Sequence, residues 1–180
     1  MNEELAQELT RMALDLHEQS DAEQTAKWFL EYVQAAIGVS HATVELIHRG
    51  GRSLTATGEI GLQFASTLSI SLRTSTSTLG TLTLYDESPN RFTEQDASTA
   101  QLYADHAAIA LARIRTESTL WEAIEARKVI GQAQGILMER FELTGDQAFA
   151  VLRRYSQDSN VKLRDLARKL ISTRNLGENV

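Results

Sequence analysis

The run from Arg127 to Ala167 reads RKVIGQAQGILMERFELTGDQAFAVLRRYSQDSNVKLRDLA, and it decides how the chain is interpreted. Within it, apolar residues recur every three or four positions in three successive series, a period typical of amphipathic helices. Arg, Lys, Gln and Asn gather between and around these series. Three short helices with such polar groups predict a compact all-α module that binds nucleic acid.

Local signals divide this run into helices. Thr144 to Gln147, TGDQ, has the form of a capping box, which starts the second helix. Ser159 or Asn160 is expected to cap the third. The apolar residues expected to face inward are Ala148, Val151, Leu152 and Tyr155 in the second helix and Leu163, Leu166, Ala167, Leu170 and Ile171 in the third.

Charge is distributed unevenly along the chain. Residues 1–120 hold 8 Lys and Arg against 16 Asp and Glu, whereas residues 121–180 hold 10 against 8. Between Arg153 and Arg174 seven cations stand against only Asp158 and Asp165. An acidic body with a basic end is therefore expected, and such an end favours a polyanionic partner.

The first helix of the run carries two apolar series. One of them, Ala123, Ala126, Ile130, Ala133 and Leu137, suffices to pack against the rest of the module. A second series needs a second partner, and Gly in a helix interior costs about 1 kcal/mol relative to Ala unless another backbone approaches closely. We therefore expect a homodimer through Trp121, Ile124, Gly131, Gly135 and Met138.

Upstream, the period changes from helix to strand. Leu5, Leu9, Met12 and Leu16, then Trp28, Tyr32 and Ala35, indicate two helices that are separated near Ser20 and Asp21, with Gly38 closing the second. Four alternating segments follow and predict an antiparallel sheet with one buried face, formed by Val44, Leu46 and His48, Leu54 and Ala56, Leu68, Ile70 and Leu72, and Leu82 and Leu84. Gly50 and Gly51 are expected to form a hairpin turn, and Arg73 to Thr78 a loop.

After Pro89 and Asn90 a long helix is expected. Thr93 is its predicted N-cap, and no Pro or Gly interrupts residues 91–130, so it can run into the C-terminal module, with any break near Thr116 to Thr119. The fold class is thus α+β, an N-terminal antiparallel sheet flanked by helices and joined by a long helix to an all-α three-helix module. We place the boundary between residues 1–116 and 117–176.

Several classes of function are disfavoured by composition. The absence of Cys excludes disulfides, thiolate chemistry, Cys zinc sites and thioether-linked cofactors. The acidic start and the lack of a long apolar run predict a cytoplasmic chain without a membrane span. No convergent acid-base or nucleophilic set appears, so no enzyme, cofactor or metal is expected. His41, Glu45 and His48 come nearest to a metal cluster, but strand geometry sends Glu45 and His48 to opposite faces.

The basic end admits a plain interpretation as a solvated charged face. Its interleaving favours binding instead, because Arg153, Arg154 and Tyr155 are followed by Gln157, Ser159 and Asn160 and then by Lys162 and Arg164. Cations that neutralise phosphates alternate there with planar groups that contact bases, as single-stranded loop RNA requires. Two short helices joined by a turn are also typical of DNA readers, which keeps duplex DNA open as a ligand.

Residues from about Trp121 to Ile171 resemble the ANTAR domain, the RNA-binding module of bacterial transcription antiterminators. The matching positions are Arg127, Ile130, Gly131, Ala133, Gly135, Leu137, Met138, Ala148, Leu152, Arg153, Ser156, Asn160, Leu163 and Ala167. Packing explains most of the apolar and small ones. The resemblance implies RNA contacts by Arg127, Gln134, Arg153, Arg154, Ser156, Asn160, Lys162 and Arg164. Gln134 stands where the family often has Lys, which weakens the attraction for phosphate there.

Residues 1 to about 116 resemble a short GAF domain in their order of helices and strands and in the helix headed by FTEQD from Phe92. Few residues separate the strands around Leu54 and Leu68, where fuller GAF domains fold a lid over a ligand, so a reduced pocket or none is expected. The cyclic-nucleotide motif of the family is absent.

The resemblances together imply a bacterial regulator that binds tandem hairpin loops of nascent RNA as a homodimer and promotes antitermination under control of the GAF-like domain. The alternative is a dimeric signalling module that binds a small molecule or a protein partner through the sheet and its helices. A helix-turn-helix DNA-binding regulator is the third interpretation.

Overall fold

The computed structural model describes residues 3–48, 51–57 and 64–173. The chain divides into two compact units, Met1–Glu117 and Ser118–Val180, called here the N-terminal and the C-terminal unit. Each unit has its own apolar core. The arrangement of helices and sheet confirms the predicted α+β class.

A four-stranded antiparallel sheet forms the centre of the N-terminal unit. Its strands are β1 (His41–His48), β2 (Gly51–Thr57), β3 (Ser66–Arg73) and β4 (Thr78–Asp86), in the order β2-β1-β4-β3. β1 and β2 pair antiparallel from His48 and Gly51 onward, as a hairpin requires, although Gly50 lies outside the described residues. Thr74 to Ser77 form the predicted loop between β3 and β4, closed by a bond from the Thr74 amide to the Ser77 carbonyl of 2.9 Å.

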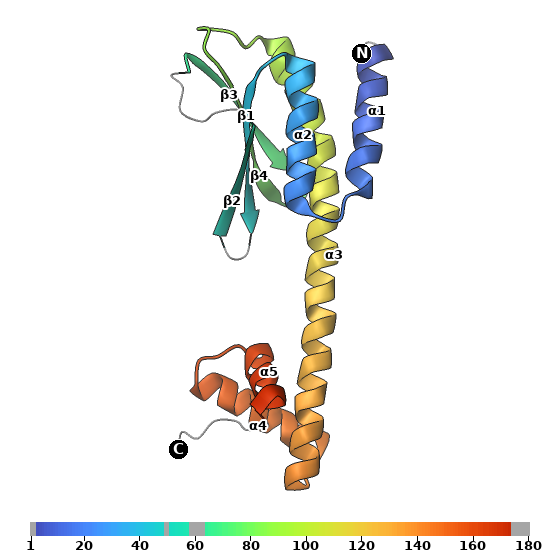
Figure 1. Ribbon diagram of the computed structural model, residues 1–180, viewed down its shortest axis with the longest axis vertical. Helices are drawn as coiled ribbons and strands as arrows, with labels where there is room; N and C mark the ends of the chain where they lie inside the picture. Colours follow the sequence, from blue (N-terminus) through green and yellow to red (C-terminus); the bar gives the residue numbers. More distant parts are fainter. Residues whose placement is uncertain (1–2, 49–50, 58–63, 174–180) are drawn as a thin grey trace. The chain divides into compact units, whose positions relative to one another are not determined.

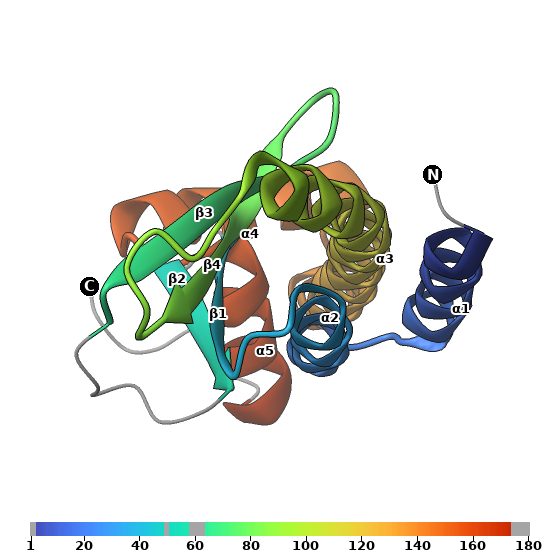
Figure 2. The same cartoon turned by 90° about the horizontal axis from the view of Figure 1, so that it is seen from above.

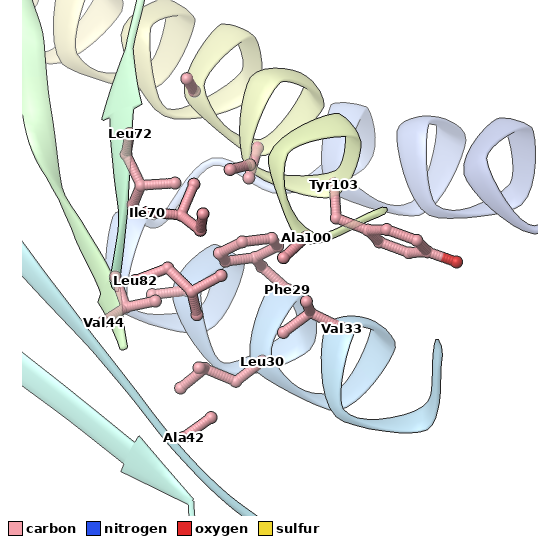
Figure 3. Close-up of a cluster of buried hydrophobic side chains, with 14 of the residues drawn as sticks. Phe29, Leu30, Val33, Ala42, Val44, Ile70, Leu72, Leu82, Ala100 and Tyr103 are labelled. Carbon is pink, nitrogen blue, oxygen red and sulfur yellow. The ribbon is translucent and has the colours of Figure 1, made fainter. Parts of the chain in front are cut away.

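Helices cover one face of this sheet. They are α2 (Ala22–Ile37) and the first part of α3 (Glu94–Phe141), and α1 (Glu3–Glu18) packs outside them. Figures 1 and 2 show α2 and α3 against the sheet and α1 on the far side of these two helices. Between helices and sheet lies a dense apolar core, shown in Figure 3, in which Phe29, Leu30, Val44, Leu72 and Leu82 are fully buried.

In two elements, β2 and α2, the apolar residues predicted to face the core do not all face it. In β2, Leu54 pairs with Glu45, whereas the core residue Val44 pairs with Thr55. Leu54 is consequently 63% exposed on the outer face, and Ala56 is exposed beside it. The alternation of β2 was right and its phase was wrong, because only the register with β1 sets which side faces the core.

The buried face of α2 is also rotated from the predicted one. Ala35 is exposed, while Trp28 and Tyr32 are only partly buried. The predicted limits of the helix are confirmed, with Asp21 as N-cap and Gly38 as a left-handed C-cap at φ 74°. Its core face consists of Thr25, Ala26, Phe29, Leu30, Val33 and Ile37.

Two arginines tie helix ends into the N-terminal unit. Arg91 donates from Nη2 to the carbonyl of Ile37 at the end of α2 (2.8 Å). Arg113 on α3 donates from Nη2 to the carbonyls of His17 (2.9 Å) and Gln19 (2.5 Å), just where α1 ends. Since carbonyls at a helix end have no intrahelical donor, these guanidinium groups satisfy acceptors that the helices leave open.

The C-terminal unit is the predicted three-helix module. It consists of the last part of α3, α4 (Gly145–Asp158) and α5 (Leu163–Thr173). α3 continues through Thr116 to Thr119 without the break that the sequence allowed. The core of the C-terminal unit is formed by Val129, Ala133, Leu137, Ala148, Leu152, Leu166, Ala167 and Leu170.

Candidate nucleic-acid interface

α4 begins with the predicted capping box. The Thr144 hydroxyl accepts from the Gln147 amide (3.4 Å), and the Gln147 side chain accepts from the Thr144 amide (2.9 Å). These bonds satisfy two amides that the first turn leaves without partners. Ala148 and Leu152 are buried in the core, so the opposite side of α4 faces solvent.

The segment from Ser156 to Lys162, called here the α4–α5 turn, has a defined internal geometry. The Val161 amide donates to the Ser156 carbonyl (3.1 Å), and the Ser156 hydroxyl donates to the Val161 carbonyl (2.6 Å). Asn160 has a φ of +51°, and its amide donates to the Gln157 carbonyl (3.2 Å). The turn is therefore held by its own hydrogen bonds.

The expected cap of the last helix is corrected by this geometry. Ser159 is instead the C-cap of α4, with its hydroxyl donating to the Tyr155 carbonyl (2.6 Å). Asn160 provides the left-handed residue of the turn. α5 starts later, at Leu163, and the Lys162 carbonyl accepts from the amides of Asp165 (2.8 Å) and Leu166 (3.0 Å).

Cations gather around this turn. Arg153, Arg154 and Lys162 are exposed, and Arg164 is partly exposed at the start of α5. Arg154 pairs with Asp158 (3.6 Å), and Arg164 with Asp165 (3.3 Å). Such exposed pairs contribute about 0–1 kcal/mol, so a phosphate group can displace the carboxylate at little cost.

Six of the eight predicted RNA contacts lie close together in the chain here, in the turn and the helix ends beside it. The other two, Arg127 and Gln134, lie on α3. The Gln134 side-chain amide donates to the carbonyl of Gly145 at the start of α4 (3.1 Å). Arg153 comes eight residues after Gly145, about 12 Å further along the helix axis. Gln134 thus fixes the opposite end of α4 from the turn.

Two cations that the set of predicted contacts omits are exposed on α5. Arg168 shares Asp165 with Arg164 (3.7 Å), and Lys169 follows it. The exposed side chain of Val161 also lies in the turn and was not singled out from the sequence. An apolar residue between two polar ones in a predicted turn is the signal that would have identified it. Arg174, counted with the basic end, lies outside the described residues.

The large side chains of the second apolar series of α3 are exposed. Trp121 is 68% exposed, and Ile124 and Met138 are exposed as well. A Cβ atom placed on Gly131 or Gly135 would meet no atom of the described residues within 4 Å. These glycines therefore give no packing advantage inside one copy of the protein.

The described residues of the N-terminal unit form no comparable cluster of functional side chains. Within the described residues no group of His, Asp and Glu is arranged to hold a metal ion. His48 bonds to the Ser53 hydroxyl (2.6 Å), and His106 bonds to the carbonyl of Leu102 one turn earlier (2.8 Å), as a boundary histidine does. The segment in which a shortened lid was predicted includes residues 58–63, which lie outside the described residues. In the described ranges no helix has the length and apolar character to cross a membrane.

Comparison with known proteins gives two family matches. The model of the GAF domain matches residues 46–111, and the model of the ANTAR domain matches residues 118–171. No curated protein sequence matches the chain.

Solved GAF domains share the N-terminal fold. One is the GAF domain of a phosphoenolpyruvate-protein phosphotransferase from Acinetobacter, with a TM-score of 0.56, 13% identity, and coverage of 66% of this chain and 99% of that one. Another is the GAF domain of a protein described as a sensor histidine kinase from Pseudomonas syringae pv. tomato, with a TM-score of 0.56, 19% identity, and coverage of 66% and 92%. At these identities the likeness concerns the fold alone.

The fold and the two matches define a regulatory protein in which a sensory domain precedes an RNA-binding domain. The chain belongs to the GAF–ANTAR proteins, as its sequence resemblance predicted. ANTAR domains mark RNA-binding regulators of the antitermination type, and neither domain is a catalytic family.

Proposed function

We propose that this protein binds hairpin loops of nascent RNA through the α4–α5 turn and the helix ends beside it, and thereby keeps a terminator from forming. The observation that carries the proposal is the concentration of cations there. Six Lys and Arg face two Asp from Arg153 to Thr173, in a chain whose formal charge is −6. A local positive field on an acidic protein directs a polyanion to one place.

The polar groups of this end suit RNA loops better than a uniform duplex. Arg153, Arg154 and Lys162 supply charge, while Tyr155 and Gln157 add planar groups that contact unstacked bases. Arg127 and Gln134 belong to α3, and we assign them a secondary part in binding. Gln134 first of all positions α4 through its bond to Gly145.

We further propose that two copies associate through the exposed series of α3, namely Trp121, Ile124, Gly131, Gly135 and Met138. Large exposed apolar side chains on one side of a helix favour a second helix as partner. Dimerisation would present two RNA-binding ends to two consecutive hairpins. Because α3 supplies residues to both units, a signal that shifts α3 in the GAF domain has a direct helical route to the ANTAR domain.

A fluorescence-anisotropy titration with a labelled tandem-hairpin RNA tests the proposed function. The double variant Arg153→Ala, Arg154→Ala should bind at least about tenfold more weakly, because two charged contacts are lost. The matched control Lys27→Ala, Arg73→Ala removes the same charge from the N-terminal unit, where both side chains are exposed, and should bind as the wild type does.

Competitors in the same titration separate the three interpretations. An RNA with scrambled loops should compete poorly if the loops are recognised. Better competition by duplex DNA would assign the protein to the helix-turn-helix readers. No binding to any of these nucleic acids would leave the GAF domain as the binding module, for a small molecule or a protein partner.

A further inference from the structure

We propose that the α4–α5 turn is a preorganised recognition loop, in which Val161 contacts a base of the RNA loop while Ser156 and Asn160 position it. The inference rests on the proposed RNA-binding function and goes beyond it. It adds one contact residue that the sequence did not indicate. It also assigns two residues, first interpreted as RNA contacts, to a positioning role.

The backbone of Val161 is fully used inside the turn. Its amide donates to the Ser156 carbonyl (3.1 Å), and its carbonyl accepts from the Ser156 hydroxyl (2.6 Å). With both polar groups engaged, the side chain is what Val161 presents to the outside, and it is 41% exposed. The same two bonds explain why a Ser stands at position 156, because its hydroxyl donates within the turn.

The residue type at position 160 follows from the backbone. Its φ of +51° lies in the left-handed region, which side chains with a Cβ rarely adopt and Asn tolerates better than most. The Asn160 amide closes the turn on the Gln157 carbonyl (3.2 Å). A contact with RNA is therefore not needed to account for Asn at this position.

Val161 has the properties of a base contact. It stands between Asn160 and Lys162 in the chain, next to a residue whose charge attracts the phosphate backbone. Bases in a loop are unstacked, so their apolar faces are exposed to water and can pack against an apolar side chain. A β-branched side chain has few rotamers to lose on binding, and its backbone is already fixed. The turn thus offers a rigid apolar surface at little entropic cost.

Variants of the full chain, titrated with the tandem-hairpin RNA, test the assignment. Asn160→Gly removes the side chain and keeps the left-handed conformation, so it should bind within about twofold of the wild type. Asn160→Ala removes the same amide and strains the turn, and should bind more weakly than Asn160→Gly. Ser156→Thr keeps the hydroxyl and should bind better than Ser156→Ala.

Val161→Ala should bind the hairpin RNA about five- to tenfold more weakly, because two methyl groups lose a buried contact. The affinity for the scrambled-loop RNA should fall less, so the ratio of the affinities for the two RNAs should become smaller. The matched control is Phe149→Ala, which truncates a similarly exposed apolar side chain near the other end of α4 and should leave binding unchanged.

The dependence on salt separates an apolar contact from a charged one. The log–log slope of affinity against salt should stay the same in Val161→Ala, and should become shallower by about 0.7 in Lys162→Ala, which loses one phosphate contact. Circular dichroism of each variant confirms that it is folded.

Two results would overturn the inference while leaving the proposed function intact. One is a loss in Asn160→Gly as large as in Asn160→Ala, which would make the amide a direct contact. The other is hairpin binding by Val161→Ala at the affinity of the wild type. If the wild-type protein itself shows no preference for the intact loops, the proposed function fails first.

Discussion

At the scale of single residues, Asp96 shows how a sequence signal becomes a stabilising interaction. Its carboxylate accepts from the amide (2.8 Å) and the hydroxyl (2.7 Å) of Thr93 and pairs with Arg91 (3.3 Å). The bond from the Thr93 amide is the main reason that the pKa of Asp96 lies below its ordinary value, and the Arg91 charge adds to it. The ionised form is thus favoured in the folded protein.

This lowered pKa predicts a pH-dependent contribution to stability. A carboxyl group whose pKa is lower in the folded state stabilises the fold above its unfolded pKa, and the contribution is lost as pH falls through the folded pKa. Asp96→Asn should therefore lower the free energy of unfolding most at neutral pH. The difference in free energy of unfolding between the wild type and this variant should become smaller in acid.

Denaturant unfolding at several pH values measures the effect, with Trp28 in a Trp121→Phe background as a reporter of the N-terminal unit. Glu94→Gln, one exposed carboxylate of the same helix turn, is the control and should show a smaller change. A gap for Asp96→Asn that stays constant from neutral to acid pH would contradict the assignment.

Tyr103 is the second residue with a marked shift. Burial, followed by the hydrogen bond to Glu8 (3.1 Å), raises the pKa of Tyr103 to about 12. The phenol therefore stays protonated at physiological pH and remains a donor to α1. A hydroxyl group thereby links the first helix of the chain to the long one.

At the scale of elements, α4 depends on its cap. Thr144→Ala removes the acceptor for the Gln147 amide and should lower the free energy of unfolding of the C-terminal unit by about 1 kcal/mol. Thr144→Asn restores a capping side chain and should recover most of the loss. Thermal unfolding followed by circular dichroism compares the two, and equal losses in both would show that the capping bond contributes nothing measurable.

The sheet shows what an element cannot determine alone. The alternation in residues 51–57 predicted a strand, and the strand is present. Leu54 nevertheless lies on the outer face, because β2 pairs with β1 in a register that places Thr55 beside Val44. Moving the register by one residue would exchange the faces, and such pairing is a property of two strands together. At Gly80, an added Cβ would collide with the backbone carbonyl of Glu45 on β1, which likewise is evident only once the strands are paired.

At the scale of the whole molecule, the proposed dimer makes a distinct prediction. Gly131→Leu meets open space within one copy, so the isolated chain should remain folded. If the backbone of a second copy packs there, the variant should dissociate at a concentration at which the wild type is dimeric, as measured by analytical ultracentrifugation. Gln132→Leu, on an exposed neighbouring position of α3, is the matched control and should leave association unchanged. Identical behaviour of both variants would place the interface elsewhere.

The sequence by itself determined the features that depend on neighbours in the chain. Helical and strand periods, the caps at Asp21, Thr93 and Thr144, and the order of basic and polar residues near Arg153 all follow from local chemistry. The family resemblance was carried by the same local motifs, and the two family matches confirm it.

Tertiary structure decided the features that depend on residues distant in sequence. The outward orientation of Leu54 and the bond between Gln134 and Gly145 each require two segments to meet. A periodic pattern specifies the kind of element, but its rotation and register are set by the shared burial of several elements. The sequence already placed the basic residues of the candidate interface on both sides of one turn, whereas only the fold showed that Gln134 bonds to the start of α4.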